Sequence, residues 1–464
     1  MATNHDLATS PADEHVDVAV VGAGLAGLTA AATAARQGDR VAVLSHGPPG
    51  GRAHTTERDG YRFNQGPHAL YTGGAGMAVL RELGIEPTGG PPSTGEGRLL
   101  VDGELRQLPA SAASLASSRW LSLRSRGQLA TVLGRLGKWD LEELGHRSGA
   151  DWLDDLGLRP DADAVLRTLA RVTTYADDMA SISADVVVGQ LRQPNVRYLD
   201  GGWQQLVDAL SGGLQPRTAR ATGLSRDGQG WLVTTDAGGV GAVRASAVVL
   251  AAGSPAACRA LLPTDPGWGE LGPASTAACL DLGLRRAPEP PIIFGADEPL
   301  YLSTHCPPAD LAPAGGAVVQ VMRYGARSAE LDRPALHELA RRAGITDDDV
   351  ATQRFLAGMV TCSAVATPAR GGLAGRPGMA ATGAEGVYLA GDWVGPVGHL
   401  ADASLASGRA AGAAAADLAS RAQALAPILH SSSFELLSQS AASLNRPGAV
   451  QASGMATSLM KDQA

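Results

Sequence analysis

The feature that most constrains this chain is a glycine-rich turn between a short apolar strand and an Ala-rich helix. Residues 17–21 are apolar and rich in β-branched side chains, as a buried parallel strand is, and Gly22, Gly24 and Gly27 follow at the spacing G-x-G-x-x-G. In this spacing Gly22 makes the tight turn, Gly24 lets a pyrophosphate approach the backbone, and Gly27 lets the helix pack on the strand. The helix N-terminus offers free N–H groups and a partial positive charge. With a helix and a second strand within residues 28–44, the unit predicts a dinucleotide site.

Two groups of motifs indicate which dinucleotide is bound. Shortly after the second strand, residues 49–53 read Pro-Gly-Gly-Arg-Ala and residues 61–68 read Tyr-Arg-Phe-Asn-Gln-Gly-Pro-His. Toward the other end, residues 386–393 read Gly-Val-Tyr-Leu-Ala-Gly-Asp-Trp, and Gly-His-Leu at 398–400 and Ala-Ser-Gly-Arg at 406–409 follow. In these motifs the chain resembles the FAD-binding amine oxidase, protoporphyrinogen oxidase and phytoene desaturase superfamily, and it is most like the phytoene desaturase branch.

The resemblance, which covers about residues 15–420, implies an α/β fold in two interleaved domains. One is a Rossmann-type FAD-binding domain, a parallel sheet with helices on both faces, and the other is an α+β substrate domain made of insertions. A chain of 464 residues is also too long for a single compact core. The expected FAD-binding segments are 15–72, 200–262 and 352–424, the substrate-binding segments are 73–199 and 263–351, and residues 1–14 and 425–464 are flexible tails.

The resemblance also assigns residues to the FAD. Asp392 is a short acceptor for a ribityl hydroxyl, and its alternative role is a helix N-cap. Leu400 begins a helix whose free N–H groups would face the pyrimidine edge of the reduced flavin. Arg52 would bind the pyrophosphate, and the backbone near Ala221 would meet the adenine. The expected FAD contacts are Gly22, Gly24, Gly27, Ser45, Gly51, Arg52, Gly66, Ala221, Gly391, Asp392 and Leu400.

Two histidines are the catalytic candidates. His399 falls where flavin amine oxidases often place an aromatic residue that lines the substrate cavity, and an imidazole there either shuttles a proton or shapes the pocket. His68 resembles the histidine in the Gly-x-His motif of the protoporphyrinogen oxidase branch. We expect this side chain to pack or to contact the flavin in preference to transferring a proton.

One position departs from the superfamily. Ser45 ends the second strand, where most members have a glutamate that accepts hydrogen bonds from both adenosine ribose hydroxyls. A serine accepts one such bond and carries no charge, which weakens FAD binding by about 1–2 kcal/mol. An NADP site is not implied, because the Gly-Gly-Arg element indicates FAD and Arg52 is already assigned.

The positions of the cysteines and lysines limit how a cofactor can be attached and which side chains can take part in catalysis. Neither FAD motif contains a cysteine, and Cys362 lies about thirty residues before Asp392, so we expect a non-covalent FAD. The four cysteines show neither metal-binding spacing nor a disulfide framework. The chain has only two lysines, Lys138 in a basic segment and Lys461 in a polar tail. A lysine beside the flavin is therefore hard to place, as is one for Schiff-base or pyridoxal chemistry.

Charge and hydropathy limit the partners. A net charge of −8 argues against nucleic acid, and residues 1–15 lack the apolar core of a signal peptide. No uncharged apolar run reaches the roughly 20 residues of a membrane-spanning helix. We therefore expect a cytoplasmic protein, for which membrane contact is possible only at its surface. The basic segment 119–139, with Trp120 and Trp139 among its arginines, can lie on an anionic membrane or form a lid helix with a solvated face.

These observations predict an FAD-dependent oxidoreductase that dehydrogenates, or desaturates, a mostly apolar organic substrate by hydride transfer to the flavin. A flavin amine oxidase acting on a C–N bond is the first alternative, ranked second because the lysine that many such enzymes hold near the flavin has no obvious counterpart. A non-redox isomerase or a binding protein with structural FAD is the second alternative, which Ser45 favours. The substrate and the electron acceptor are not determined by the sequence.

Overall fold

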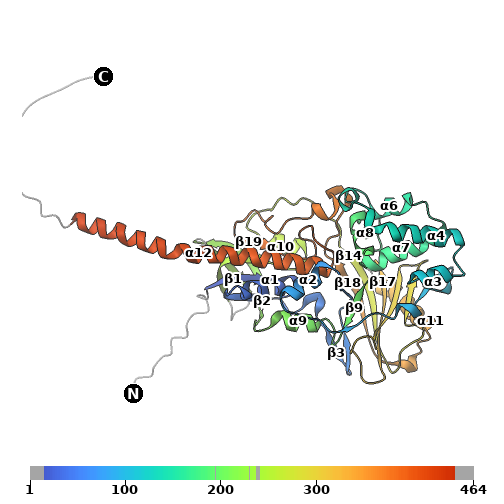
Figure 1. Cartoon of the computed structure of the whole chain (residues 1–464). Coiled ribbons are helices and arrows are strands. Elements are labelled where there is room, and N and C mark those ends of the chain that lie inside the picture. The colour runs from blue at the N-terminus through green and yellow to red at the C-terminus, as the bar shows by residue number, and fades with distance from the viewer. Residues whose placement is uncertain (1–14, 194, 229, 237–240, 445–464) are drawn as a thin grey trace, which may run out of the picture. The chain divides into compact units, whose positions relative to one another are not determined.

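The computed structural model describes residues 15–193, 195–228, 230–236 and 241–444, and it is built around two seven-stranded sheets (Figure 1). Residues up to Ala419 form one compact unit, and a second unit begins at Ser420. The α/β fold class predicted from the sequence is confirmed.

The first sheet is the expected parallel sheet with an antiparallel extension. Its strand order is β10-β2-β1-β13-β12-β11, and β19 pairs with β13. The parallel strands are β1 (His15–Val21), β2 (Val41–Ser45), β10 (Arg217–Thr218), β13 (Ala242–Leu250) and β19 (Val387–Leu389). Antiparallel pairing adds β11 (Ala221–Asp227) and β12 (Gly230–Thr235).

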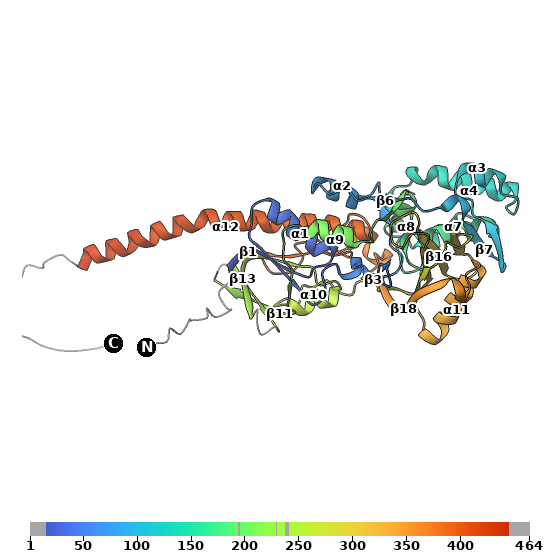
Figure 2. The same cartoon turned by 90° about the horizontal axis from the view of Figure 1, so that it is seen from below.

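Helices cover both faces of this sheet because its central strands are apolar on both sides. Val18 and Val20 of β1 pack with one set of helices, α1 (Leu25–Arg36), α9 (Gln204–Ser211) and the start of α12 (Ala401–Leu444). Ala19 and Val21 point to the other face and pack with α10 (Pro255–Leu261) (Figure 2). Such burial on both faces is what the continuous apolar run indicated.

The start of α12 lies very close to α1. A Cβ atom at Gly408 would stand 2.3 Å from the carbonyl oxygen of Ala26, and one at Gly412 would stand 2.3 Å from that of Ala30. Only glycine permits this backbone approach. The contact places the beginning of α12 beside the N-terminal half of α1, where the nucleotide motif lies.

The second sheet has the order β18-β14-β17-β16-β15-β7-β8. Its strands are β7 (Arg98–Val101), β8 (Glu104–Gln107), β14 (Ser275–Leu284), β15 (Ile292–Gly295), β16 (Leu300–Cys306), β17 (Ala317–Tyr324) and β18 (Val350–Cys362). β7 and β8 form a hairpin that turns at Asp102 and Gly103. β18 lies mostly in the segment 352–424, which was predicted to belong to the FAD-binding domain. In the structure it pairs with β14 along its whole length and so belongs to the second sheet. A sequence pattern can indicate a strand, but it does not show which sheet the strand joins.

Helices cover this sheet on both faces as well. One face packs on a helical layer, and the other packs on α11 (Ala329–Arg342) (Figure 1). The helical layer is α3 (Ala112–Ser117), α4 (Leu123–Arg135), α5 (Leu141–Leu144), α6 (Gly149–Asp155), α7 (Pro160–Thr174) and α8 (Ala184–Leu191). The remaining elements are β3 (Thr56–Arg58), β4 (Tyr61–Phe63), β5 (Leu70–Tyr71), α2 (Ala75–Glu82), β6 (Gly89–Gly90) and β9 (Val196–Leu199).

The C-terminal helix runs further than predicted. α12 ends at Leu444, so residues 425–444, which were predicted to belong to a flexible tail, are helical. Ala, Leu, Gln and Glu favour helix even where no apolar periodicity marks it. The predicted tails 1–14 and 445–464 lie outside the described residues.

The basic segment 119–139 exposes both apolar and charged side chains. Leu123 at the start of α4 is 80% exposed, the largest exposure among the large apolar residues of the described chain, and Arg124 and Arg135 are exposed on the same helix. Contact of this face with a membrane stays a prediction. None of the described helices is both long enough and apolar enough to cross a membrane.

Candidate functional site

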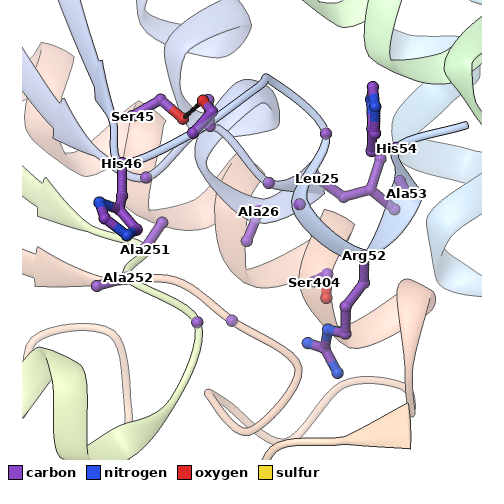
Figure 3. Close-up of a pocket in the computed structure, with 18 of the residues that line it drawn as sticks. Leu25, Ala26, Ser45, His46, Arg52, Ala53, His54, Ala251, Ala252 and Ser404 are labelled. Carbon is purple, nitrogen blue, oxygen red and sulfur yellow. Dashed lines mark hydrogen bonds between the residues drawn. The ribbon is translucent and has the colours of Figure 1, made fainter. Parts of the chain in front are cut away.

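A cavity of about 1200 Å³ opens where the parallel strands of the first sheet end. Gly22 after β1, Ser45 at the end of β2 and Ala251 after β13 all line it. This is the edge of an open α/β sheet at which ligands bind, because the strands' carboxyl ends and the helix N-termini meet there. Figure 3 shows Ser45 and His46 at the end of β2, together with Arg52 and Ser404 among the other lining residues.

The glycine motif has the geometry that its spacing predicted. Gly22 has φ +110°, and a Cβ there would stand 2.1 Å from the carbonyl oxygen of Ala251. A Cβ at Gly27 would stand 1.8 Å from the carbonyl oxygen of Gly22, so glycine is required for helix and turn to meet. Gly24 differs, because a Cβ there would meet no protein atom within 4 Å and would project into open space.

The first turn of α1 is left for a ligand. Its N-cap residue is Gly24, which supplies no side-chain hydrogen bond, and Leu25 and Ala26 line the cavity. Helix N-terminal amides without an internal partner bind anions. The loop after β2 closes on this turn, since the Gly50 N–H donates to the Ala23 carbonyl at 2.7 Å.

Arg52 and Asp392 join the two ends of the sequence. The Arg52 Nη1 lies 2.9 Å from one carboxylate oxygen of Asp392, and the Ser363 N–H donates to the same oxygen at 2.8 Å. Burial alone would raise the pKa of the Asp392 carboxyl, but the charge and hydrogen bond of Arg52, together with Ser363, hold that pKa below its ordinary value. Arg52 also donates to the carbonyl of Thr361 at 3.2 Å. Contact of Arg52 with pyrophosphate therefore stays a prediction, and the structure shows an ion pair.

A second arginine fixes the loop before α12. Arg376 donates from Nη1 to the Asp392 carbonyl at 3.0 Å and from Nη2 to the Gly398 carbonyl at 2.6 Å. Leu400, with φ +53°, turns the chain into α12, and both Leu400 and Ala401 line the cavity. The N-terminus of α12 thus faces the same cavity as that of α1.

The structure brings most of the predicted residues together. Nine of them line the cavity: Gly22, Gly24, Ser45, Gly51, Arg52, His68, Ala221, Gly391 and Leu400. Four stand behind its wall: Gly27, Gly66, Asp392 and His399. Gly66 supports the wall, because a Cβ there would stand 2.3 Å from the sulfur of Met359, which lines the cavity.

The two histidines have different places. His399 is only 2% exposed, and its Nε2 lies 2.9 Å from the Thr174 carbonyl, so it joins the loop before α12 to the end of α7 behind the cavity wall. His68 lines the cavity, with Nδ1 2.9 Å from the Gly66 carbonyl and its ring 4.9 Å from that of Trp203. Burial lowers the pKa of each to about 4, so both are neutral near pH 7.

Several lining residues had no sequence signal. Tyr71, Tyr175, Trp203 and Met359 line the cavity, and they come from four separate elements or loops. Tyr175 has φ +53° at the end of α7, a conformation that sequence periodicity does not reveal. Trp203 follows a Gly-Gly pair that marked a turn, and this was the only available signal.

The family is decided by comparison with known proteins. A family model described as flavin containing amine oxidoreductase matches residues 25–279. This chain belongs to that family. The flavin and the oxidoreductase activity named in that description are those of the family. Coproporphyrinogen III oxidase of Propionibacterium freudenreichii is similar at 34% identity over 115 residues, 24% of this chain and 22% of that protein.

Other relatives of the flavin containing amine oxidoreductase family match more widely. AofH of Mycobacterium tuberculosis, named for a flavin-containing monoamine oxidase, is 29% identical over 280 residues, 54% of this chain and 59% of its own length. The chain thus spans less than two thirds of either curated relative.

Among solved structures, putrescine oxidase bound to putrescine gives a TM-score of 0.65 at 18% identity, covering 86% of this chain and 98% of that one. Cyclohexylamine oxidase of Brevibacterium oxydans gives 0.64 at 17% identity, covering 87% and 99%. These two likenesses establish the fold alone.

The cavity residues fit a flavin. The second carboxylate oxygen of Asp392, Oδ1, is buried and has no hydrogen-bond partner among the described residues. A buried acceptor of this kind normally has a partner, and a ligand hydroxyl would supply it. The open space at Gly24 and the free first turn of α1 suit phosphates in the same way.

Proposed function

We propose that this protein is an FAD-dependent oxidoreductase that dehydrogenates an uncharged, mostly apolar substrate, with its FAD held without a covalent bond. The observation that carries the proposal is the composition of the cavity wall near Leu400. Pro67, Tyr71, Tyr175 and Met359 line the cavity, and Tyr175 and Met359 pack with Leu400 against one apolar cluster. Among the described residues, the only carboxylate in the lining, Asp236, lies beside Ser45 instead, and no lysine lines the cavity. Such a wall favours a neutral molecule, because an unpaired charge buried against it would be costly.

The chain's own residues would hold the cofactor along the whole cavity. The α1 N-terminus and Gly24 would take the pyrophosphate, Asp392 Oδ1 the ribityl chain, and the N-terminus of α12 the pyrimidine edge. When bound, the flavin supplies the two-electron redox chemistry. The apolar wall excludes water and orients the substrate, and neutral His68 keeps its Nδ1 proton on the Gly66 carbonyl.

The absence of cysteine from the cavity lining supports non-covalent binding. The chain's four cysteines, Cys258, Cys279, Cys306 and Cys362, are all buried, and none lines the cavity. Burial raises the pKa of the Cys362 thiol to about 12, so this nearest candidate is protonated and a poor nucleophile.

An amine oxidase is the second candidate. AofH, which is named for a flavin-containing monoamine oxidase, favours it, and an apolar wall would also accept the hydrocarbon part of an uncharged amine. A diamine would not be accepted, since its second ammonium group would meet no carboxylate at the Leu400 end. The absence of any lysine from the lining keeps this candidate second.

A non-redox role with structural FAD is the third candidate, and it predicts a different experimental result. The purified protein should be mixed anaerobically with polyenes, porphyrinogens and amines in turn while the flavin absorbance is recorded. Dehydrogenation predicts bleaching by one of the apolar compounds and recovery of colour in air. Bleaching by amines alone would establish the second candidate. A flavin that light reduces but that no compound reduces would support the third.

A further inference from the structure

The adenosine end of the cavity has no acid where the second strand ends. Ser45 lines this end, but its hydroxyl donates to the Gly47 carbonyl at 2.6 Å. A hydroxyl has only one proton, so Ser45 retains acceptor capacity and nothing more for a ligand. The adenosine half of FAD presents ribose hydroxyls and an exocyclic amine, all hydrogen-bond donors that need acceptors.

One carboxylate lines the cavity, and it lies beside Ser45. The Ala219 N–H donates to the Ser45 carbonyl at 2.9 Å. The next amide of the same chain, Arg220 N–H, donates to the Asp236 Oδ1 at 3.0 Å. Consecutive amides therefore join Ser45 to Asp236, and both residues line the cavity together with Ala221.

The Asp236 side chain is available to a ligand. Its Oδ1 is used by Arg220, and its own N–H donates to the Arg220 carbonyl at 3.0 Å, so the residue is held in place from both sides. Its Oδ2 has no hydrogen-bond partner among the described residues, and the residue is exposed and lines the cavity. A fixed carboxylate with a free oxygen accepts charge-assisted bonds, which are stronger than a neutral hydroxyl's.

We infer that Asp236 binds the adenosine half of the FAD and supplies the acidic acceptor that Ser45 does not. The carboxylate comes from the end of β12 in the antiparallel extension, not from the end of β2. The inference rests on the proposed FAD cofactor, and it makes the affinity for FAD, but not for FMN, dependent on Asp236.

The test measures flavin binding to the deflavinated protein. Wild type and Asp236→Asn are titrated with FAD and with FMN, which lacks the adenosine, and each dissociation constant is read from fluorescence quenching. The asparagine keeps an oxygen for the Arg220 amide, so the fold should be retained. We expect the Kd for FAD to rise about 10-fold and the Kd for FMN to stay unchanged.

A matched control separates this effect from a change in net charge. Glu385 is exposed and does not line the cavity, so Glu385→Gln should leave both dissociation constants unchanged. An FAD analogue with hypoxanthine in place of adenine assigns the bond. If the analogue binds the two proteins equally, Asp236 accepts from the adenine amine, and if the 10-fold difference persists it accepts from the ribose.

Two results would overturn the inference. Equal FAD affinity of Asp236→Asn and wild type would show that Asp236 makes no adenosine contact, while the cofactor proposal would stand. An equal loss for FAD and FMN would show that Asp236 acts only through the fold. Wild type that binds FMN but not FAD would overturn both this inference and the proposed cofactor.

Discussion

The guanidinium of Arg52 lies 2.9 Å from the carboxylate of Asp392, a residue 340 positions further along the chain. Because Ser363 donates to the same carboxylate, the loop after β2, the end of β18 and the loop after β19 converge on one buried oxygen. The two flavin motifs are thus parts of one wall.

Replacing this carboxylate should damage the site more than the fold. In Asp392→Asn the ion pair is lost, and the buried oxygen Oδ1, which we propose accepts a hydrogen bond from the cofactor, becomes part of an amide. We expect flavin affinity to fall by at least about 10-fold and stability to fall by about 1–3 kcal/mol, less than for a fully buried pair because the Arg52 side chain is 40% exposed. Flavin content and urea unfolding measure the two effects. Asp59→Asn, which alters an exposed pair with Arg58, is the control and should change neither.

The glycine motif offers a second test. Gly24→Val places a side chain in the open space where the pyrophosphate is expected, and its Cβ meets no protein atom within 4 Å, so the protein should fold without its flavin. The visible spectrum and the circular dichroism of the purified variant measure this. Gly127→Val, at an exposed helical position with equally open space, should keep normal flavin content. Yellow Gly24→Val protein would show that the motif has been misinterpreted.

The state of the flavin is tested by acid precipitation. All four cysteines are buried and lie outside the cavity lining, so all of the yellow colour should pass to the supernatant. Chromatography of that supernatant should give FAD. Colour that stays with the precipitated protein would demonstrate a covalent bond.

Local motifs predicted the centre of the site, and tertiary contacts determined the rest. The strand, turn and helix around Gly22–Gly27 could be predicted because each glycine's role depends on immediate neighbours. The partner of Arg52 could not, because nothing local to position 52 indicates Asp392. Asp236 was likewise missed, since it follows an ordinary hairpin strand and reaches the cavity only through pairing with Arg220.

The second sheet shows the same limit. The sequences of β14 and β17 are mostly apolar, whereas that of β16 is mixed, although it is fully buried. Its sequence carries Ser303, Thr304 and His305, which interrupt the apolar pattern. These polar residues are buried by the fold, not by any periodicity that the sequence displays.

The buried His305 gives a pH-dependent prediction. Its ring is stacked on Tyr198 at 3.8 Å, both ring nitrogens lack hydrogen-bond partners among the described residues, and burial, with a smaller effect of His68, lowers its pKa to about 3. The unfolded chain, with a pKa near 6.5, therefore binds a proton that the folded chain does not between about pH 6.5 and 3. Stability should fall as pH falls through this window.

His305→Phe should remove that loss. At pH 5, 1.5 pH units below 6.5, the gain in stability should exceed the gain at pH 7.5 by about 2 kcal/mol, at about 1.36 kcal/mol for each unit. The phenyl ring keeps the stacking on Tyr198 and leaves no unpaired nitrogen. Urea unfolding at the two pH values measures the difference. His15→Phe at the exposed start of β1 is the control, and an equal gain at both pH values for His305→Phe would contradict the prediction.

The last prediction concerns Ser45. Ser45→Glu should tighten FAD binding, because a carboxylate at the end of β2 accepts charge-assisted bonds from the adenosine ribose that the serine, with its proton on the Gly47 carbonyl, does not match. We expect a decrease in Kd of about 5-fold, limited by the desolvation of a residue that is only 7% exposed.

The size of this gain should depend on Asp236. If it already holds the same hydroxyls, Ser45→Glu should gain more in an Asp236→Asn background than in wild type, since the two carboxylates would otherwise repel and compete for one set of donors. Equal gains in the two backgrounds would show that the residues bind separate parts of the adenosine, and weaker binding in both would show that the Ser45 side chain does not face the ribose.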